Sequence, residues 1–88
     1  MDIQYFVPGL FEDEVRKVFS SSFDSCEIKE YIQYGNFAFL SKISFIGWVG
    51  HVKYYYDFKL FDLMEWHKDG VLTKVLESKK EFLLNTKR

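Results

Sequence analysis

Apolar side chains recur along the chain with two different spacings, and each spacing predicts one kind of secondary structure. Residues 11–19 repeat apolar side chains every three or four positions, with acidic residues in the first turn, which is typical of an amphipathic helix. Residues 26–33, 37–46 and 52–62 alternate apolar and polar positions, which is typical of half-buried strands. Glycine-containing turns are expected between them, at residues 34–36 and 47–50, so these three strands should form an antiparallel meander.

Two further elements are expected outside the meander. Residues 3–7 alternate between Ile3, Tyr5 and Val7 on one side and Gln4 and Phe6 on the other. This alternation predicts a first strand that ends at Pro8. Asp69 can cap a helix that carries an apolar stripe over residues 71–76. Residues 78–86 fit either a continuation of that helix or a closing strand, and the pattern alone does not choose between them.

These elements predict a fold of the α+β class in a single domain over residues 1–88. We expect a small antiparallel sheet of about four strands with two helices on one face, either ferredoxin-like or in the order β-α-β-β-β-α. The opposite face of the sheet would then be open to solvent or to a partner. The side chains predicted to pack the helices on the sheet are Val15, Val18, Phe19, Leu72, Val75 and Leu76.

Composition narrows the class of protein. Cys26 is the only cysteine, so the disulfide-stapled class of small secreted proteins is excluded. The first residues have no basic segment followed by an apolar stretch, so we expect no signal peptide. No apolar run approaches the ~20 residues that span a bilayer, so we expect a reducing, cytoplasmic location without membrane contact. Aromatic residues make up 20 % of the chain, more than a domain of this size can place entirely in its core.

The first half of the chain resembles the RNA-recognition motif family. Residues 5–10 (Tyr-Phe-Val-Pro-Gly-Leu) look like the first-strand motif of that family, and residues 37–40 (Phe-Ala-Phe-Leu) look like the core of its third-strand motif. The resemblance implies that Phe6, Phe37 and Phe39 are exposed on the sheet and stack on nucleic-acid bases.

This resemblance covers roughly residues 3–45 and is not continued beyond them. The family places a helix after the third strand, whereas residues 47–62 of this chain have the pattern of a turn and a strand. Alternating aromatic residues in a small sheet also fit an ordinary core with cross-strand ring pairs, and that alternative remains open.

Two other aromatic residues are candidate anchors for a partner. Tyr55 lies between Lys53 and Asp57 on a strand whose other positions are apolar, so its ring should point away from the core. Trp48 lies in the predicted turn at residues 47–50. Tyrosine and tryptophan are enriched at binding hot spots, which makes both rings candidate contacts. The partner-binding residues predicted from the sequence are therefore Trp48, Tyr55, Phe6, Phe37 and Phe39.

Catalytic and metal-binding patterns are weak. Asp57, Asp62, Glu65, His67 and Asp69 form an acidic group with one histidine, but their spacing matches no metal-binding loop. A nucleophile pair of Cys26 and His51 is conceivable, yet Cys26 alternates with apolar positions as a core thiol would. We therefore expect no enzymatic activity, no bound metal and no cofactor.

The expected function is a small non-enzymatic protein that modulates or inhibits a macromolecular partner, with a protein as the first choice of partner. Phe, Tyr, Met, Ile, Asn and Lys total 35 residues while Gly, Ala, Arg and Pro total nine, a bias of AT-rich coding that suggests a phage or viral accessory inhibitor. A homodimer or a stable hetero-complex is also expected, because an open aromatic sheet face tends to be covered. The alternative is a single-stranded nucleic-acid (RNA) binding module, which needs basic side chains beside its rings, such as Lys29 and Lys42.

Overall fold

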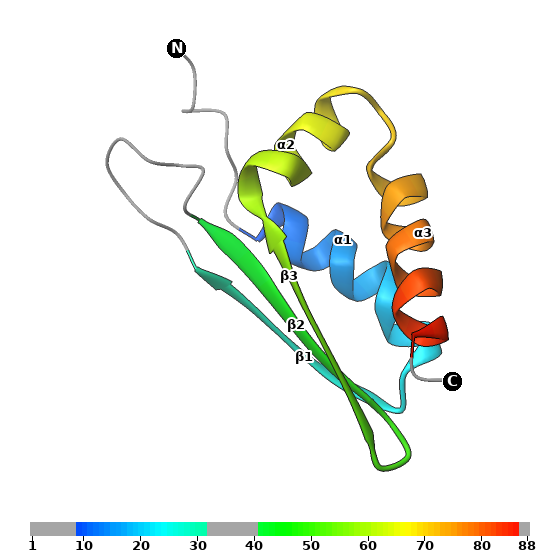
Figure 1. Cartoon of the computed structure of the whole chain (residues 1–88). Coiled ribbons are helices and arrows are strands. Elements are labelled where there is room, and N and C mark those ends of the chain that lie inside the picture. The colour runs from blue at the N-terminus through cyan, green and yellow to red at the C-terminus, as the bar shows by residue number, and fades with distance from the viewer. Residues whose placement is uncertain (1–8, 32–40, 87–88) are drawn as a thin grey trace.

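The computed structural model describes residues 9–31 and 41–86, which form one α+β unit with a three-stranded sheet and three α-helices. Figure 1 shows the order of the elements along the chain. The elements are the helix α1 (Leu10–Phe19), the short 3₁₀ helix η2 (Ser20–Ser22), the strands β1 (Ser25–Tyr31), β2 (Lys42–Val49) and β3 (Val52–Lys59), and the helices α2 (Leu60–Lys68) and α3 (Leu72–Asn85).

The three strands form an antiparallel sheet in the order β1-β2-β3, which is the meander predicted from the sequence. Phe45 of β2 lies between Ile28 of β1 and Tyr56 of β3, and this register holds along the whole sheet. The turn between β2 and β3 contains Gly50 at φ 63°, a left-handed conformation that glycine adopts without strain. The Gly50 N–H donates a hydrogen bond of 2.7 Å to the Asp24 carboxylate, which ties this turn to the start of β1.

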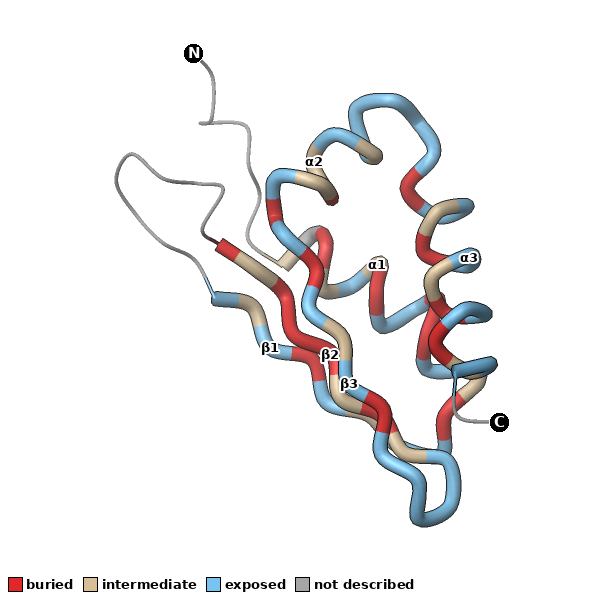
Figure 2. The backbone as a smooth tube through the Cα atoms, viewed as in Figure 1, coloured by how far each residue is buried: buried red, intermediate tan, exposed pale blue. Residues whose placement is uncertain are grey.

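All three helices cover the same face of the sheet. Figure 1 shows them on one side of the strands, and Figure 2 shows that the buried backbone positions lie between the two layers. The sheet contributes Ile28, Ile43, Phe45, Tyr54 and Phe58 to the core, and these alternate with residues of the opposite face. The expected helix–sheet packing is therefore confirmed, with Val75 half-buried and the other five predicted core residues buried.

Aromatic rings make up the centre of this core. The Phe19 ring of α1 has its centroid 4.7 Å from the Phe45 ring and 5.8 Å from the Phe58 ring. Phe23, which follows η2, lies edge-on to Phe45 at 4.9 Å and to Tyr54 at 5.4 Å. Tilted and edge-to-face pairs are the arrangements that ring quadrupoles favour, so these contacts add to the burial of apolar area.

A buried lysine connects the helices α1 and α3. The Lys80 ammonium donates a hydrogen bond of 3.3 Å to the Val18 carbonyl near the end of α1 and lies 3.2 Å from the Glu77 carboxylate. The C-terminal end of a helix carries partial negative charge, so the cation is well placed there. Burial of this charge is tolerated because both partners compensate for the lost hydration.

Several predicted boundaries were wrong. The strand expected over residues 52–62 ends at Lys59, and α2 begins at Leu60. The buried pair Leu60 and Leu63 has helical spacing, so both leucines reach the core from a helix and not from a strand. The turn expected over residues 47–50 begins only at Gly50, because β2 continues through Trp48 to Val49.

Other expectations are resolved in part. Residues 78–85 belong to α3, so the open choice for this segment is settled as helix. Three strands and three helices replace the four strands and two helices expected, within the described residues. The predicted first strand at residues 3–7, and residues 32–33 and 37–40 of the predicted meander strands, lie outside the described residues.

The carboxylate of Glu30 lies near the start of α1, where the helix dipole favours a negative charge but burial opposes it. Its Oε1 accepts a hydrogen bond of 2.9 Å from the Gly9 N–H, while its Oε2 is buried without a hydrogen-bond partner among residues 9–31 and 41–86. Burial raises the pKa of Glu30; the Gly9 hydrogen bond opposes this rise, and the negative charges of Glu12 and Asp13 add to it. The folded state therefore favours the protonated form.

We expect Glu30→Gln to raise the thermal midpoint at neutral pH, because the variant removes a charge that burial and two neighbouring carboxylates disfavour. A raised pKa means that the wild type gains stability as the pH falls from neutral through the folded-state pKa of Glu30, and stops gaining near the ordinary glutamate pKa of 4.5. Thermal unfolding between pH 4 and 8 measures this. The Glu30→Gln protein should lack that gain, and Glu27→Gln, an exposed control on the same strand, should keep it.

Candidate functional site

The face of the sheet opposite the helices is the largest continuous surface that the fold leaves without a covering element in the described ranges. We call it the open face. Because directly paired residues point to the same side of a sheet, the register assigns twelve residues to this face, in four rows of three. The rows are Ser25, Trp48 and Lys53; Glu27, Ile46 and Tyr55; Lys29, Ser44 and Asp57; and Tyr31, Lys42 and Lys59.

Three aromatic rings lie on the open face, one on each strand. The rings of Tyr55 and Tyr31 are 55 % and 49 % exposed, and Trp48 is half-buried. Trp48 is a diagonal neighbour of Tyr55, because Tyr55 is paired with Ile46, two positions before Trp48. The side chains of diagonal neighbours start about 7–8 Å apart, so these two rings and Ile46 form a continuous apolar strip across β2 and β3.

Four lysines surround these rings. Lys53 is paired with Trp48, and Lys42 is paired with both Tyr31 and Lys59. The Lys42 ammonium lies 5.5 Å from the centre of the Tyr31 ring, within the range of a cation–π contact. The ammonium groups of Lys29, Lys53 and Lys59 make no hydrogen bond or ion pair with other residues of the described part of the chain. Three of the four cations are thus available to a ligand.

Asp57 is the acidic centre of this face, and its charge is stabilised by its neighbours. Partial burial raises its pKa, but hydrogen bonds from Ser44 at 2.6 Å and Tyr55 at 3.1 Å, together with the Lys42 ammonium at 3.4 Å, outweigh burial and lower the pKa of Asp57 below its usual value. The carboxylate therefore stays ionised at neutral pH. Its hydrogen bonds orient the Tyr55 ring on the open face.

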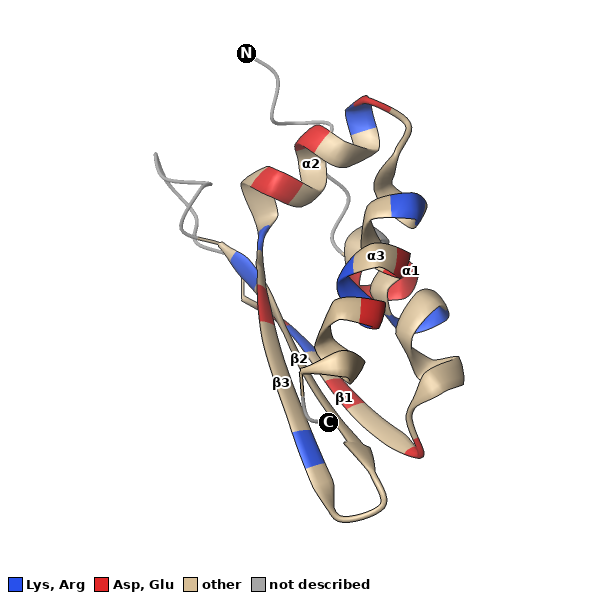
Figure 3. Cartoon of the chain, turned by 45° about the vertical axis from the view of Figure 1, so that its right-hand side comes forward, with Lys and Arg blue, Asp and Glu red and all other residues tan. Residues whose placement is uncertain are grey.

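The charges of the molecule are segregated between its two sides. The open face carries four lysines and two carboxylates, a net charge of +2. The remaining described residues carry six basic and ten acidic side chains, a net charge of −4. Figure 3 marks the lysines along all three strands and the many acidic positions on the helices. A protein with a net charge of −1 thus presents a basic sheet face.

The structure brings together only part of the predicted site. Trp48 and Tyr55 both lie on the open face, although Trp48 belongs to β2 and not to a turn. Phe6, Phe37 and Phe39 lie outside the described residues, as do most of the residues that carry the resemblance to the RNA-recognition motif family.

Lys29 and Lys42, expected beside the rings of a nucleic-acid module, do lie on the open face. Sequence reasoning missed Tyr31, Lys53 and Lys59 as members of the same surface. Strand alternation already places these three opposite the core-facing residues, but only the register joins them to Trp48 and Tyr55.

Other candidate chemistry finds little support in the described residues. No three histidine, cysteine, aspartate or glutamate side chains gather closely enough there to hold a metal ion. Cys26 is half-buried on the core-facing side of β1, opposite Gly47, whereas His51 is exposed in the turn after β2. In the same ranges, no helix is long and apolar enough to cross a bilayer.

A hollow of about 310 Å³ lies between α1 and the connection from α2 to α3. It is lined by Glu14, His67, Gly70, Leu72 and Thr73. The Thr73 hydroxyl donates a hydrogen bond to the Glu14 carboxylate, and the His67 ring lies edge-on to the Phe11 ring at 5.7 Å. Because Glu14 and Thr73 already bind each other, two of the polar side chains that line the hollow are not free for a ligand.

Comparison with known proteins adds no family to this description. No family model matches the chain, and comparison with curated proteins and with solved structures finds no match.

Proposed function

We propose that this protein is a non-enzymatic binding protein that engages a macromolecular partner through the open face of its sheet. The observation that carries the proposal is the strip formed by Trp48, Ile46 and Tyr55, bordered by unpaired lysines and left uncovered by the three helices. Large, rigid rings contribute much contact area at a low cost in conformational entropy, so they are the usual anchors of a binding surface.

A protein of this kind acts by occupying its partner. The open face is a flat array and not a pocket, so its ligand must be extended over several strands. Covering such a surface on the partner blocks whatever else binds there. This is the physical basis for a modulator or inhibitor, the role expected from the sequence, and a phage or viral origin remains part of that proposal.

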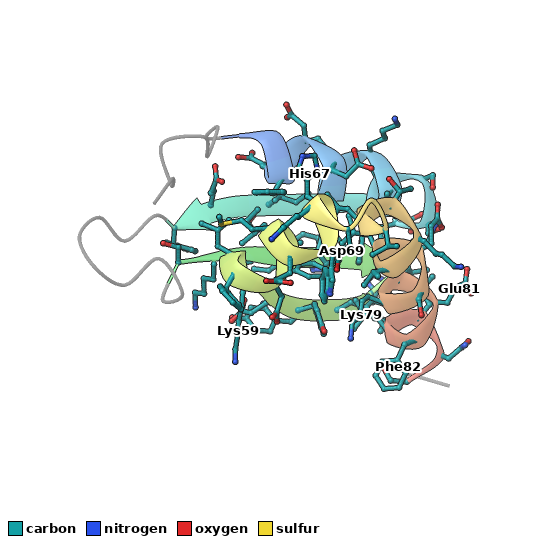
Figure 4. The ribbon with its side chains drawn as sticks, turned by 90° about the horizontal axis from the view of Figure 1, so that it is seen from above. Lys59, His67, Asp69, Lys79, Glu81 and Phe82 are labelled. Carbon is teal, nitrogen blue, oxygen red and sulfur yellow. The ribbon has the colours of Figure 1, made fainter. Side chains whose placement is uncertain are left out.

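A homodimer formed face to face is disfavoured by charge. Two copies of the open face would bring together two surfaces of net charge +2, each with Lys42 and Lys59 side by side. On the helical side, Phe82 is 67 % exposed and projects from the end of α3 (Figure 4), but two copies of that acidic side would repel each other as well. The open face therefore remains available to a different molecule.

The experiment that tests the proposal compares three variants in the same capture assay. Immobilised wild-type protein, Trp48→Ala, Tyr55→Ala and the control Phe82→Ala are incubated with a bacterial extract, and bound protein and bound nucleic acid are each quantified. We expect each open-face variant to reduce the bound partner about tenfold or more, because loss of an anchor ring costs about 2 kcal/mol. Phe82→Ala, which removes a ring from the helical side that is more exposed than Tyr55, should bind like the wild type.

Equal capture by all four proteins would show that binding does not use the open face and would contradict the proposal. Thermal unfolding of each variant checks that the sheet is intact. This check matters most for Trp48, whose ring is half-buried.

A further inference from the structure

We propose that the partner of the open face is a single strand of nucleic acid, whose bases stack on Trp48 and Tyr55 and whose phosphates lie against the four lysines. This inference rests on the proposed function and names the class of partner. It is carried by residues of β1, β2 and β3, none of which belongs to the aromatic motifs at residues 5–10 and 37–40.

The composition of the open face favours nucleic acid over protein. Lysine, glutamate, aspartate and serine are depleted at protein–protein interfaces, where arginine, methionine and aromatic residues are enriched. Eight of the twelve open-face residues belong to the depleted types, and none is arginine or methionine. Aromatic rings separated by lysines are instead what a single strand requires, since each ring can stack on a base and each ammonium can contact a phosphate.

The lysines of the open face are placed where a polyanion could contact them, although one pair of them destabilises the sheet. Lys42 and Lys59 are directly paired on adjacent strands, and like charges in such a pair destabilise a sheet. Lys42 has Asp57 at 3.4 Å, but Lys59 has no hydrogen-bond or ion-pair partner among the described residues. An anionic ligand at this end of the open face would relieve the repulsion.

The dimensions of the face suit a short strand. Lys59 and Lys53 lie at opposite ends of β3, six residues apart, which corresponds to about 20 Å along an extended chain. Trp48 and Tyr55 lie diagonally next to each other near the Lys53 end. The separation of diagonal neighbours, about 7–8 Å, allows two splayed bases to stack, one on each ring. A duplex keeps its bases stacked on each other and cannot use these rings in this way.

The direct test is fluorescence anisotropy of the purified protein with labelled 12-nucleotide oligo(dT) and oligo(U), at 50 mM and 200 mM salt. If three or four phosphates are contacted, the binding constant should fall about 20- to 50-fold between these salt concentrations. Tyr55→Ala should weaken binding by about 5- to 150-fold, whereas Tyr55→Phe, which keeps the ring, should bind nearly as the wild type. Lys59→Gln should make the salt dependence shallower, and Lys74→Gln, an exposed lysine of α3, should leave it unchanged.

Tryptophan emission provides a second, independent readout. Trp66 lies in α2 on the other side of the sheet, so in a Trp66→Phe protein the only tryptophan is Trp48. Oligo(dT) or oligo(U) should quench the emission of Trp48, with the same midpoint as the anisotropy titration. A 12-base-pair duplex should produce less quenching, because its bases are not free to stack.

The outcomes separate this inference from the function on which it rests. Absence of oligonucleotide binding, together with extract capture of protein that requires Trp48 and Tyr55, would overturn the nucleic-acid inference and leave the open face as a protein-binding surface. Oligonucleotide binding that is insensitive to Tyr55→Ala and Lys59→Gln would overturn the inference, because the strand would then bind elsewhere. Tighter binding of the duplex than of either single strand would also overturn it.

Discussion

Phe19→Ala should destabilise the protein by about 3–5 kcal/mol, which is a large part of the total stability of a domain this small. The Phe19 side chain is completely buried and packs against two rings of the sheet, with centroids 4.7 Å from Phe45 and 5.8 Å from Phe58. Truncation leaves a cavity among rigid rings that cannot collapse into it. Urea unfolding should show a much lower midpoint, or no cooperative transition at all.

The matched control for this prediction is Phe82→Ala, which removes the same side chain from an exposed position of α3. Its effect should stay within about 0.5 kcal/mol, since surface substitutions away from special features rarely exceed that value. If Phe19→Ala lowered the thermal midpoint by only a degree or two, the central position of α1 in the core would be wrong.

The helix and the meander could be predicted because their apolar residues have unambiguous periods. Val15, Val18 and Phe19 fit only a helical face, and the alternation around Phe45 fits only a strand. The prediction that the helices share one face of an antiparallel sheet followed from these two patterns and is confirmed.

The boundary between β3 and α2 could not be read in the same way. Leu60 continues the alternation of Phe58 and also begins the helical spacing to Leu63, so the two periods overlap at one residue. Helix α2 also begins without a side-chain cap, since its N-cap residue is Lys59 and makes no capping hydrogen bond. With neither a break in pattern nor a capping residue, the sequence offers no signal for the start of α2.

The candidate site was predictable in its parts but not in its assembly. Alternation alone places Tyr55 and Lys53 on the outward side of one strand and Lys29 on the outward side of another. Which of these residues are neighbours depends on the register between strands. That register could not be derived from the expected elements, because residues 47–49 were expected to form a turn and in fact lengthen β2. The row that joins Trp48 to Lys53 exists only in the observed register.

Gly47 is the reason why a turn was expected at residues 47–50, and the second large prediction concerns this residue. It does not adopt a positive φ, so its backbone would accept any residue. Its importance is steric, because a Cβ atom at this position would lie 2.6 Å from Cζ of Phe45 and 2.7 Å from Cδ1 of Phe23. Both rings belong to the core and pack edge-on at 4.9 Å, so neither can move without disturbing the other.

We therefore expect Gly47→Val to destabilise the protein by about 3 kcal/mol or more and Gly47→Ala by about 1–3 kcal/mol, the cost of overpacking a filled core. Chemical unfolding of both variants measures these values.

A double variant tests the steric cause directly, because Phe23→Leu should create space next to the new methyl group. In a Phe23→Leu background, Gly47→Ala should cost less than it does alone, because residues in direct contact have non-additive effects. Strictly additive free energies of unfolding would show that the Phe23 ring is not what keeps residue 47 a glycine.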